Sequence, residues 1–337
     1  MEAYLYESLE NNKVKCNLCS HRCVIKDGDR GICSVRENAG GILQTLVFGK
    51  LIAQHIDPIE KKPLFHFLPG TLSYSIATVG CNFRCQFCQN ADIAQMPADH
   101  SGMIMGYTCS PSSAVAAAVQ GGCKSISYTY TEPTVFFEFA YETAKLAAGK
   151  GLRNVFVTNG YMTAEALEMI YPYLDAANVD LKAYSNKYYK ELCGARLKHV
   201  QATLKLMKSL GVFVEVTTLI VPGLNDDPAE LKDMAAFIVQ ILGPATPWHI
   251  SRFHPTYKLT DSPPTPVKTL IMAREIGLKA GLRYVYTGNV YGHAAESTFC
   301  YSCGETVIER RGFQVGKLRI KNGQCIKCNT KIDGVWE

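Results

Sequence analysis

Between residues 71 and 290 the sequence alternates short apolar runs with longer segments of helical spacing. The apolar runs are rich in β-branched and aromatic residues, and they predict buried strands at 72–79, 124–130, 153–158, 177–182, 212–220, 248–253 and 283–288. The segments between them, such as SPSSAVAAAVQ and TAEALEMIYPYL, have the spacing of amphipathic helices. Strands that alternate with helices predict a parallel sheet, and seven such strands fit a closed or partly open β/α barrel. The active site of such a barrel lies at the carboxyl ends of its strands.

Two irregular segments that contain cysteines flank this region. Residues 1–70 contain four cysteines and several glycines and show no sustained helical or strand period. Residues 291–337 carry hairpin-like sequence between two cysteine pairs. We therefore expect three units: an N-terminal metal-binding segment at 1–70, an α/β barrel at 71–290 and a small C-terminal metal-binding domain at 291–337.

The composition indicates a compact chain with a mild charge and many cysteines. The 337 residues include 14 cysteines and 19% charged residues, and the formal net charge is +5. That charge is too small to indicate nucleic acid or an anionic membrane as a partner. No window approaches about 18 uncharged apolar residues, and the first residues lack a signal-peptide pattern, so we expect a cytoplasmic protein without membrane spans. In that reducing compartment, clustered cysteines are metal ligands rather than disulfides.

Three cysteines follow the first predicted strand of the barrel region. The stretch GCNFRCQFCQN places Cys81, Cys85 and Cys88 in the pattern C-x3-C-x2-C, with an aromatic residue before the last cysteine. Structural zinc requires four closed ligands, and a thioredoxin-like site requires two. Three thiolates leave an iron–sulfur cluster one ligand short, so that one iron is free to bind a reactant. We interpret the loop as a catalytic cluster site.

This loop resembles the signature of the radical S-adenosylmethionine (SAM) superfamily. The resemblance implies a [4Fe–4S] cluster held by the three cysteines, with an open iron that binds the amino and carboxylate groups of SAM. It implies an anaerobic oxidoreductase in which one electron cleaves SAM to methionine and a 5′-deoxyadenosyl radical, which abstracts hydrogen from a substrate. An electron donor such as a ferredoxin or flavodoxin is implied as well.

Other segments of the barrel region resemble the pyruvate formate-lyase activating enzymes of this superfamily. SYTYTEP retains the Glu-Pro of the family's SAM-binding turn, but Tyr130 and Thr131 replace two glycines. VTNG, NVDLK and SRFHP match later strand ends, and Val157 replaces an acidic residue of the family. The cofactor-binding residues that the resemblance implies are Phe87, Glu132, Pro133, Thr158, Asn159, Asp180, Lys182 and His254. Asp180 and Lys182 are favoured also by their place at the carboxyl rim of a barrel, whereas His254 could be an ordinary loop histidine.

The flanking cysteine groups predict two further metal sites. The C-terminal group has two C-x2-C pairs around hairpin-forming sequence, which is typical of a zinc ribbon, with a rubredoxin-like iron as the alternative. The N-terminal group, C-x2-C-x3-C-x9-C, fits zinc or an auxiliary iron–sulfur cluster, and its last interval favours zinc. The predicted ligands are Cys16, Cys19, Cys23 and Cys33 at the N-terminal site, and Cys300, Cys303, Cys325 and Cys328 at the C-terminal site.

Over essentially its full length the chain resembles the radical SAM component of the AmmeMemoRadiSam system, often labelled a pyruvate formate-lyase activating enzyme homologue. The resemblance rests on CNLCSHRCVIKDGDRGICSVREN, GCNFRCQFCQN, YTYTEPTVFFE, DLKAY, RFHPTYK and TGNVYGHAAESTFCYSCG. It implies AMMECR-type and Memo-type partner proteins in a multicomponent pathway.

Several hypotheses about function remain open. The first is a radical step on an unidentified small-molecule or protein substrate, which the departures at 130, 131 and 157 favour. The second is a glycyl-radical-enzyme activase that acts on a glycine of a partner protein. The third, from another class, is a zinc-dependent nucleic-acid-binding protein, which the low density of lysine and arginine disfavours. An RNA-modifying radical SAM enzyme is favoured over pure nucleic-acid binding.

Overall fold

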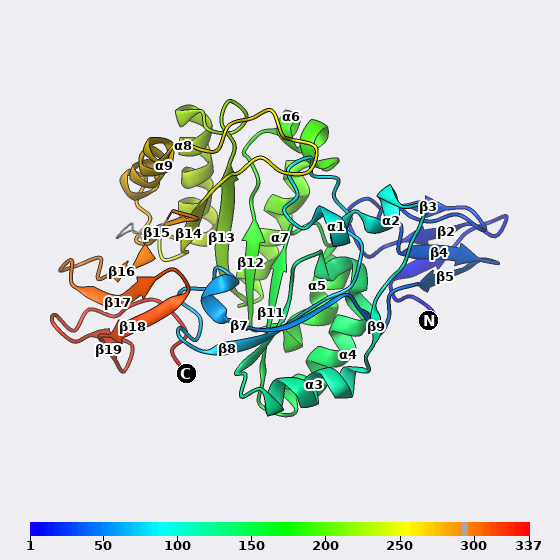
Figure 1. Ribbon diagram of the computed structural model, residues 1–337, viewed down its shortest axis with the longest axis horizontal. Helices are drawn as coiled ribbons and strands as arrows, with labels where there is room; N and C mark the ends of the chain where they lie inside the picture. The colour runs from blue at the N-terminus through cyan, green and yellow to red at the C-terminus, as the bar shows by residue number, and fades with distance from the viewer. Residues whose placement is uncertain (291–295) are drawn as a thin grey trace.

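The structure is a computed structural model that describes residues 1–290 and 296–337 (Figure 1). At its centre lies an eight-stranded sheet with the order β15-β14-β13-β12-β11-β10-β8-β7. The strands of this sheet are β7 (Ala53–Pro58), β8 (Leu72–Ala77), β10 (Ser125–Tyr128), β11 (Arg153–Thr158), β12 (Ala176–Asp180), β13 (Phe213–Ile220), β14 (Trp248–Arg252) and β15 (Val285–Gly288). The strands from β8 to β15 are parallel, which confirms the predicted α/β architecture. Because β7 and β15 form its two edges, the barrel is partly open rather than closed.

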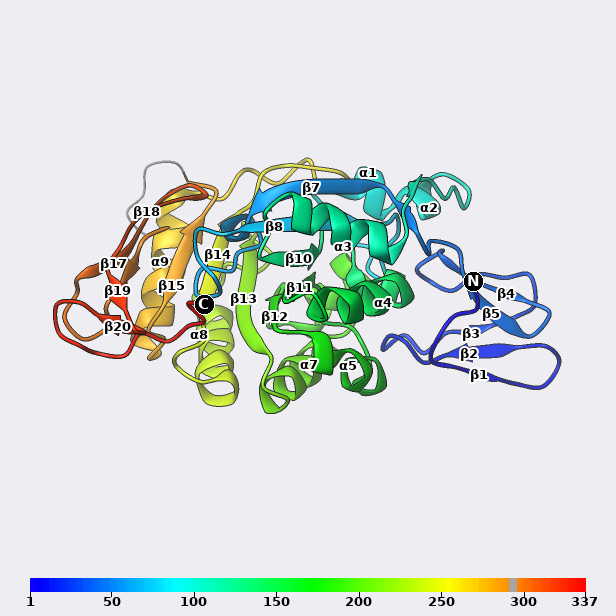
Figure 2. The ribbon, with the colours of Figure 1, turned by 90° about the horizontal axis from the view of Figure 1, so that it is seen from below.

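The helices lie along the crossovers between the parallel strands (Figures 1 and 2). The α-helices are α1 (Ala91–Ala94), α2 (Met96–Asp99), α3 (Pro111–Gln120), α4 (Phe137–Ala148), α5 (Ala164–Ile170), α6 (Asn186–Tyr188), α7 (Leu197–Ser209), α8 (Pro228–Phe237) and α9 (Val267–Lys279). Short 3-10 turns occur at Ile59–Lys61, Pro133–Phe136 and Tyr171–Tyr173, and π turns occur at Tyr189–Cys193 and Ile238–Leu242. Side-chain caps fix several helix starts: Ser110 accepts from Ser113 N, and Thr163 accepts from Ala166 N. None of the helices in the described residues is long and apolar enough to cross a membrane.

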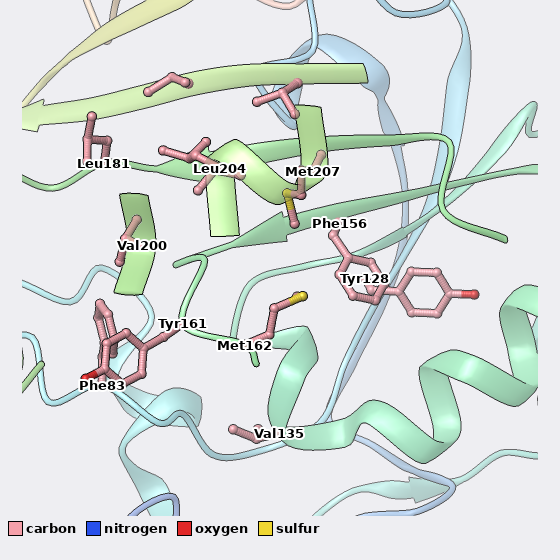
Figure 3. Close-up of a cluster of buried hydrophobic side chains, with 14 of the residues drawn as sticks. Phe83, Tyr128, Val135, Phe156, Tyr161, Met162, Leu181, Val200, Leu204 and Met207 are labelled. Atoms are coloured by element: carbon pink, nitrogen blue, oxygen red, sulfur yellow. The ribbon is translucent and has the colours of Figure 1, made fainter. Parts of the chain in front are cut away.

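The main core lies on both faces of the central sheet. All four residues of β10 are buried, as expected for a parallel strand that is covered on both sides. Tyr128 of β10 packs edge-on against Phe156 of β11, with ring centroids 5.3 Å apart. Leu204 and Met207 of α7 belong to the same buried cluster, part of which is drawn in Figure 3. This packing holds the strands rigidly and fixes where their carboxyl ends lie.

The N-terminal segment forms small sheets at one end of the molecule (Figures 1 and 2). Its strands are β1 (Tyr6–Ser8), β2 (Val14–Cys16), β3 (Val24–Ile25), β4 (Arg36–Ala39), β5 (Ile42–Thr45) and β6 (Lys50–Leu51), the last of which pairs with β9 (Tyr107–Thr108). A fully buried ion pair between Arg36 and Glu138 of α4 joins this segment to the barrel. The segment expected at 1–70 also supplies β7, an antiparallel edge strand of the central sheet that the sequence pattern did not predict.

The C-terminal strands lie at the opposite end of the molecule (Figures 1 and 2). They are β16 (Thr298–Phe299), β17 (Thr306–Arg311), β18 (Gln314–Leu318), β19 (Ile320–Lys321) and β20 (Gln324–Cys325). Of the domain expected at 291–337, residues 291–295 lie outside the described residues. Arg310 is buried and donates to the Phe65 carbonyl at 2.6 Å and to Thr298 Oγ1 at 2.7 Å. The bond to Phe65 attaches the C-terminal strands to the segment that precedes β8, and the bond to Thr298 joins β17 to β16.

Candidate active site

A cavity of about 420 Å³ lies at the carboxyl ends of the barrel strands. That volume is in the range of small-molecule sites, and the position is where barrels carry their chemistry. The residues singled out in the sequence that line it are Cys81, Cys85, Phe87, Cys88, Glu132, Thr158, Asn159, Asp180 and Lys182. They come from the loops after β8 and β10 and from the carboxyl ends of β11 and β12 with the residues that follow, so the fold brings together residues as far apart in the sequence as Cys81 and Lys182.

The three cysteines lie on the loop that leaves β8. Gly80 turns the chain with a φ of 101°, and a Cβ there would come within 2.5 Å of Val35 Cγ1, so glycine lets the loop pack on the N-terminal segment. Cys81 Sγ accepts a hydrogen bond from Phe83 N at 3.3 Å. Burial raises the pKa of Cys88 to about 11 and raises that of Cys81 well above its ordinary value. A bound metal is therefore needed to hold these sulfurs as thiolates.

Glu132 links the ends of β10 and β11 from a fully buried position. Its Oε1 accepts from the backbone N–H of Thr134 at 3.0 Å and from Thr158 Oγ1 at 2.7 Å, and its Oε2 accepts from Asn159 N at 2.8 Å. Asn159 in turn donates its side-chain N–H to Asn82 Oδ1 at 2.7 Å. The carboxylate thus holds the strand ends and, through Asn159, the cysteine loop. Burial raises the pKa of Glu132, and these hydrogen bonds partly offset that effect.

Asp180 and Lys182 form an ion pair at the end of β12. Lys182 Nζ lies 2.6 Å from Asp180 Oδ2, and both residues line the cavity. Burial by itself lowers the pKa of Lys182, but the Asp180 carboxylate raises it above its ordinary value, so the lysine remains charged. The pair gives the cavity wall one positive and one negative group side by side. These are the groups needed to bind a ligand that carries both an amino group and a carboxylate.

Other residues singled out in the sequence lie elsewhere. Pro133 is buried at the start of a 3-10 turn and is not among the residues that line the cavity. His254 is exposed and is also not among them, so the geometry does not support the expected contact with the cofactor. The reason is the alternation after β14: the preceding Phe253 is fully buried and its N–H donates to Thr265 Oγ1 at 2.9 Å, which directs the next side chain outward.

A charged cluster that sequence reasoning missed forms another part of the cavity wall. Lys61 and Lys62 line the cavity and donate to the two oxygens of Asp57, at 2.9 and 2.7 Å. Tyr130 donates its hydroxyl to the same carboxylate, and its ring lies 4.5 Å from Lys62 Nζ. Burial lowers the pKa of Lys62 to about 8, although Asp57 opposes this effect. The pattern gave no signal for this cluster, because its lysines lie in and just after a short 3-10 turn between β7, which was not predicted, and β8.

Tyr130 stands where the activating enzymes have a glycine, and its backbone keeps the conformation that glycine favours. Its φ is 62°, in the left-handed region that costs a bulky residue about 1 kcal/mol or more. Asn90, beside the cysteine loop, donates to the Tyr130 carbonyl at 2.7 Å. Tyr130 therefore adds a large side chain to the cavity wall while its backbone adopts a conformation that glycine adopts more easily.

Two buried polar atoms on the cavity wall have no hydrogen-bond partner within the described residues. They are Asn178 Oδ1 and Thr217 Oγ1. Buried polar groups are nearly always paired, so such atoms indicate that a ligand completes the site. Three converging thiols, these unpaired atoms and the size of the cavity fit a [4Fe–4S] cluster together with a SAM molecule.

The C-terminal cysteines form a compact metal-binding site. The ligand sulfurs of Cys300, Cys303, Cys325 and Cys328 all lie within 4.8 Å of one another. Cys300 and Cys328 are 3.6 Å apart at sulfur, and Cys303 and Cys325 are 3.8 Å apart. A tetrahedral zinc with Zn–S bonds of about 2.3 Å places its sulfurs roughly 3.8 Å apart. The site therefore has the dimensions of a single tetrahedral ion.

Comparison with known families agrees with this geometry. Residues 75–238 match the radical SAM superfamily, a range that begins in β8 and includes the cysteine loop. Together with the three-cysteine site on an open α/β barrel, this match shows that the chain belongs to the radical SAM superfamily.

Individual relatives span very different shares of the chain. The uncharacterized protein MJ0808 of Methanocaldococcus jannaschii is 48% identical over 334 residues, which cover 98% of each chain. The pyruvate formate-lyase-activating enzyme of Streptococcus mutans is 23% identical over 176 residues, 50% of this chain and 66% of that enzyme. The similarity to activating enzymes is thus distant and covers half of the chain.

Solved structures share the fold at low sequence identity. A radical SAM methyltransferase from Sphaerobacter thermophilus has a TM-score of 0.51 at 14% identity, covering 71% of each chain. Streptococcus suis SuiB bound to S-adenosylmethionine has a TM-score of 0.52 at 14% identity, covering 72% of this chain and 56% of SuiB. These similarities concern the barrel fold and carry no information on substrate.

Proposed function

We propose that this protein is a radical SAM enzyme that abstracts hydrogen from a small-molecule or protein substrate, within a multicomponent system of the kind its sequence resembles. Cys81, Cys85 and Cys88 would hold a [4Fe–4S] cluster, and the cavity beside them would hold SAM. When bound, these groups supply one-electron cleavage of SAM and a carbon radical that abstracts hydrogen. The observation that carries the proposal is the convergence of three thiols, of which Cys85 is buried and Cys81 and Cys88 are half-buried, on a cavity at the carboxyl ends of the strands.

The chain's own residues position and shield these groups. Glu132 and Asn159 hold the cysteine loop against the ends of β10 and β11. Asp180 and Lys182 offer opposite charges to the amino and carboxylate groups of SAM. Phe87 is almost fully buried and lines the cavity, so it excludes water from the cysteines.

The side chains of the cavity wall support the hypothesis that the substrate enters the barrel. Tyr130 fills space that a glycine would leave open, and Lys61 and Lys62 share a single carboxylate, so this wall carries a net positive charge. Such a wall favours a substrate with an acidic group. A glycyl-radical activase is the second candidate, and the distant similarity to pyruvate formate-lyase-activating enzymes supports it.

We also propose zinc for the C-terminal site, because its sulfur spacing matches tetrahedral zinc. Its four closed ligands leave no position for a reactant, so the metal would be structural. The strands between the two cysteine pairs are attached to the rest of the chain through the bond from Arg310 to the Phe65 carbonyl, which is consistent with a structural role.

The proposal is tested by anaerobic reconstitution with iron and sulfide, followed by dithionite and SAM, with 5′-deoxyadenosine as the product measured. Cys88→Ala should abolish this product, because it removes one of three ligands of the cluster. Cys109→Ala is the matched control: it also removes a cysteine, but one that does not line the cavity. Equal product from wild type and Cys88→Ala, or none from wild type with zinc bound at the central loop, would contradict the proposal.

A further inference from the structure

The N-terminal cysteines surround a cavity of their own. Cys16, Cys19, Cys23 and Cys33 line a space of about 20 Å³ between the N-terminal segment and the barrel. That volume is enough for a water-sized group. A zinc ion in an S4 site lies only about 2.3 Å from each sulfur and leaves no such space at its centre. The four cysteines therefore line open space that a zinc ion bound by all four sulfurs would not leave between them.

The spacing of the N-terminal sulfurs can be compared with the spacing in the other two cysteine groups of the chain. Among the described residues, only the C-terminal cysteines include three or more ligand atoms that all lie within 4.8 Å of one another. Neither the N-terminal sulfurs nor those of the central cysteine loop are that close. Sulfurs that bind different irons of a cluster lie farther apart than sulfurs that share one ion. Like the radical SAM loop, the N-terminal site thus lacks the close sulfur spacing of the zinc-like site.

Arg36 supplies a second, independent indication of a ligand. Its side chain is only 2% exposed and lines the same cavity. Its Nη2 binds the Glu138 carboxylate at 2.5 and 2.6 Å, but Nε and Nη1 have no hydrogen-bond partner within the described residues. Leaving a buried donor unpaired is unfavourable, so a partner that accepts from these N–H groups would stabilise the site. Sulfides and thiolates of an iron–sulfur cluster accept such bonds and carry the negative charge that a guanidinium favours.

The site touches the central cysteine loop. His21, between the N-terminal cysteines, has its Nε2 2.8 Å from the carbonyl oxygen of Asn82. Arg84, beside Cys85, donates to Ser34 Oγ at 3.4 Å, and Ser34 follows Cys33. A cofactor in the N-terminal site therefore lies next to the loop that carries the radical chemistry.

We propose that Cys16, Cys19, Cys23 and Cys33 bind a [4Fe–4S] cluster, with Arg36 donating hydrogen bonds to its sulfurs. The proposal concerns a site apart from the active-site cavity and does not depend on the proposed function. It replaces the zinc that the sequence spacing favoured at this site.

The test separates the two cysteine sites within the full chain. A variant with Cys81→Ala, Cys85→Ala and Cys88→Ala is reconstituted with iron and sulfide and assayed for iron, sulfide and zinc, and for an electron paramagnetic resonance signal after reduction. We expect about half of the wild-type iron to remain, with one zinc per chain. Adding Cys19→Ser and Cys33→Ser to this variant should remove the remaining iron and leave the zinc. Iron-free protein with two zinc ions per chain, or with the N-terminal site empty, would overturn the proposal.

The proposed function and the proposed N-terminal cluster can be tested independently of each other. Cys19→Ser with Cys33→Ser in an otherwise wild-type chain keeps the central loop, so iron retained there reports on the proposed function alone. Arg36→Lys provides a second readout, since it keeps the charge but removes the unpaired N–H groups. It should retain iron and lower the midpoint potential of the N-terminal cluster, because hydrogen bonds to sulfur stabilise the reduced form. An unchanged potential would count against the assignment.

Discussion

Glu132→Gln is the substitution that most directly tests how the barrel positions its active site. The glutamate oxygens accept bonds from Thr134, Thr158 and Asn159 in a buried position. A glutamine keeps the size but offers one acceptor oxygen. If that oxygen remains with the threonines, the backbone N–H of Asn159 faces an NH₂ group and is left unpaired. The hydroxyl of Thr158 can rotate to another acceptor, whereas a backbone N–H cannot.

The expected loss of stability follows from that orphaned donor. One unpaired buried N–H costs about 1–3 kcal/mol. Relief of the burial penalty, which raises the Glu132 pKa, offsets part of this cost because the glutamine carries no charge. We therefore expect a free energy of unfolding lower by about 1–3 kcal/mol, measured by urea unfolding followed by far-ultraviolet circular dichroism.

The functional effect should exceed the effect on stability. Asn159 holds Asn82, the neighbour of Cys81, at 2.7 Å. Loss of a group that orients metal ligands typically lowers metal affinity or activity about 10–100-fold, so 5′-deoxyadenosine formation should fall by that factor. Thr158→Val is the comparison variant: it removes a hydroxyl that donates to Glu132 and accepts from Gly160 N at 3.0 Å, and it leaves the Asn159 bond to Glu132 intact. Wild-type stability and product formation in Glu132→Gln would refute the view that this carboxylate braces the strand ends.

Three further predictions concern charges and metals outside that network. Lys62 has a pKa of about 8 in the folded protein and 10.5 as its ordinary value, so the unfolded chain binds more protons in between. The free energy of unfolding should therefore rise with pH between about pH 8 and pH 10.5. Lys62→Met should remove this rise, which urea titrations across that range would measure. Arg310→Met should cost about 3–5 kcal/mol and increase proteolysis near the C-terminal strands, because Glu60 and the Phe65 carbonyl lose a buried cation; an unchanged cleavage pattern would argue against this attachment. Cys325→Ser should release one metal ion per chain, measured by atomic absorption, and retention of that ion would show that the four cysteines do not share it.

The barrel and its cysteine loop could be predicted because both depend on local pattern. Runs such as those at β10 and β11 contain β-branched or aromatic residues and are buried along most of their length, as strands of a covered parallel sheet are. The spacing of Cys81, Cys85 and Cys88 is itself a local geometric fact, since a single loop carries all three ligands. A parallel barrel also fixes the side on which the site lies, because active sites of such barrels lie at the carboxyl ends of the strands.

The rest of the site depends on contacts between distant segments. Lys61 and Lys62 reach the cavity only because β7 adds to the sheet edge beside β8, a pairing of 53–58 with 72–77 that no period in the sequence announces. His254 was expected at the cavity from its motif, but whether its side chain faces in or out is decided by how Phe253 packs.

The sequence by itself determined the ligand types, the alternation of strands and helices that builds the barrel, and the side of the barrel where chemistry can occur. It did not determine the metal at each cysteine group, because C-x2-C spacing is compatible with both zinc and an iron–sulfur cluster. Only the tertiary structure decided how far apart the four N-terminal sulfurs lie, since their positions depend on how the N-terminal segment packs against α4 through Arg36 and Glu138. Metal preference follows from that spacing and from nearby buried donors, and both are properties of packing rather than of the order of residues along the chain.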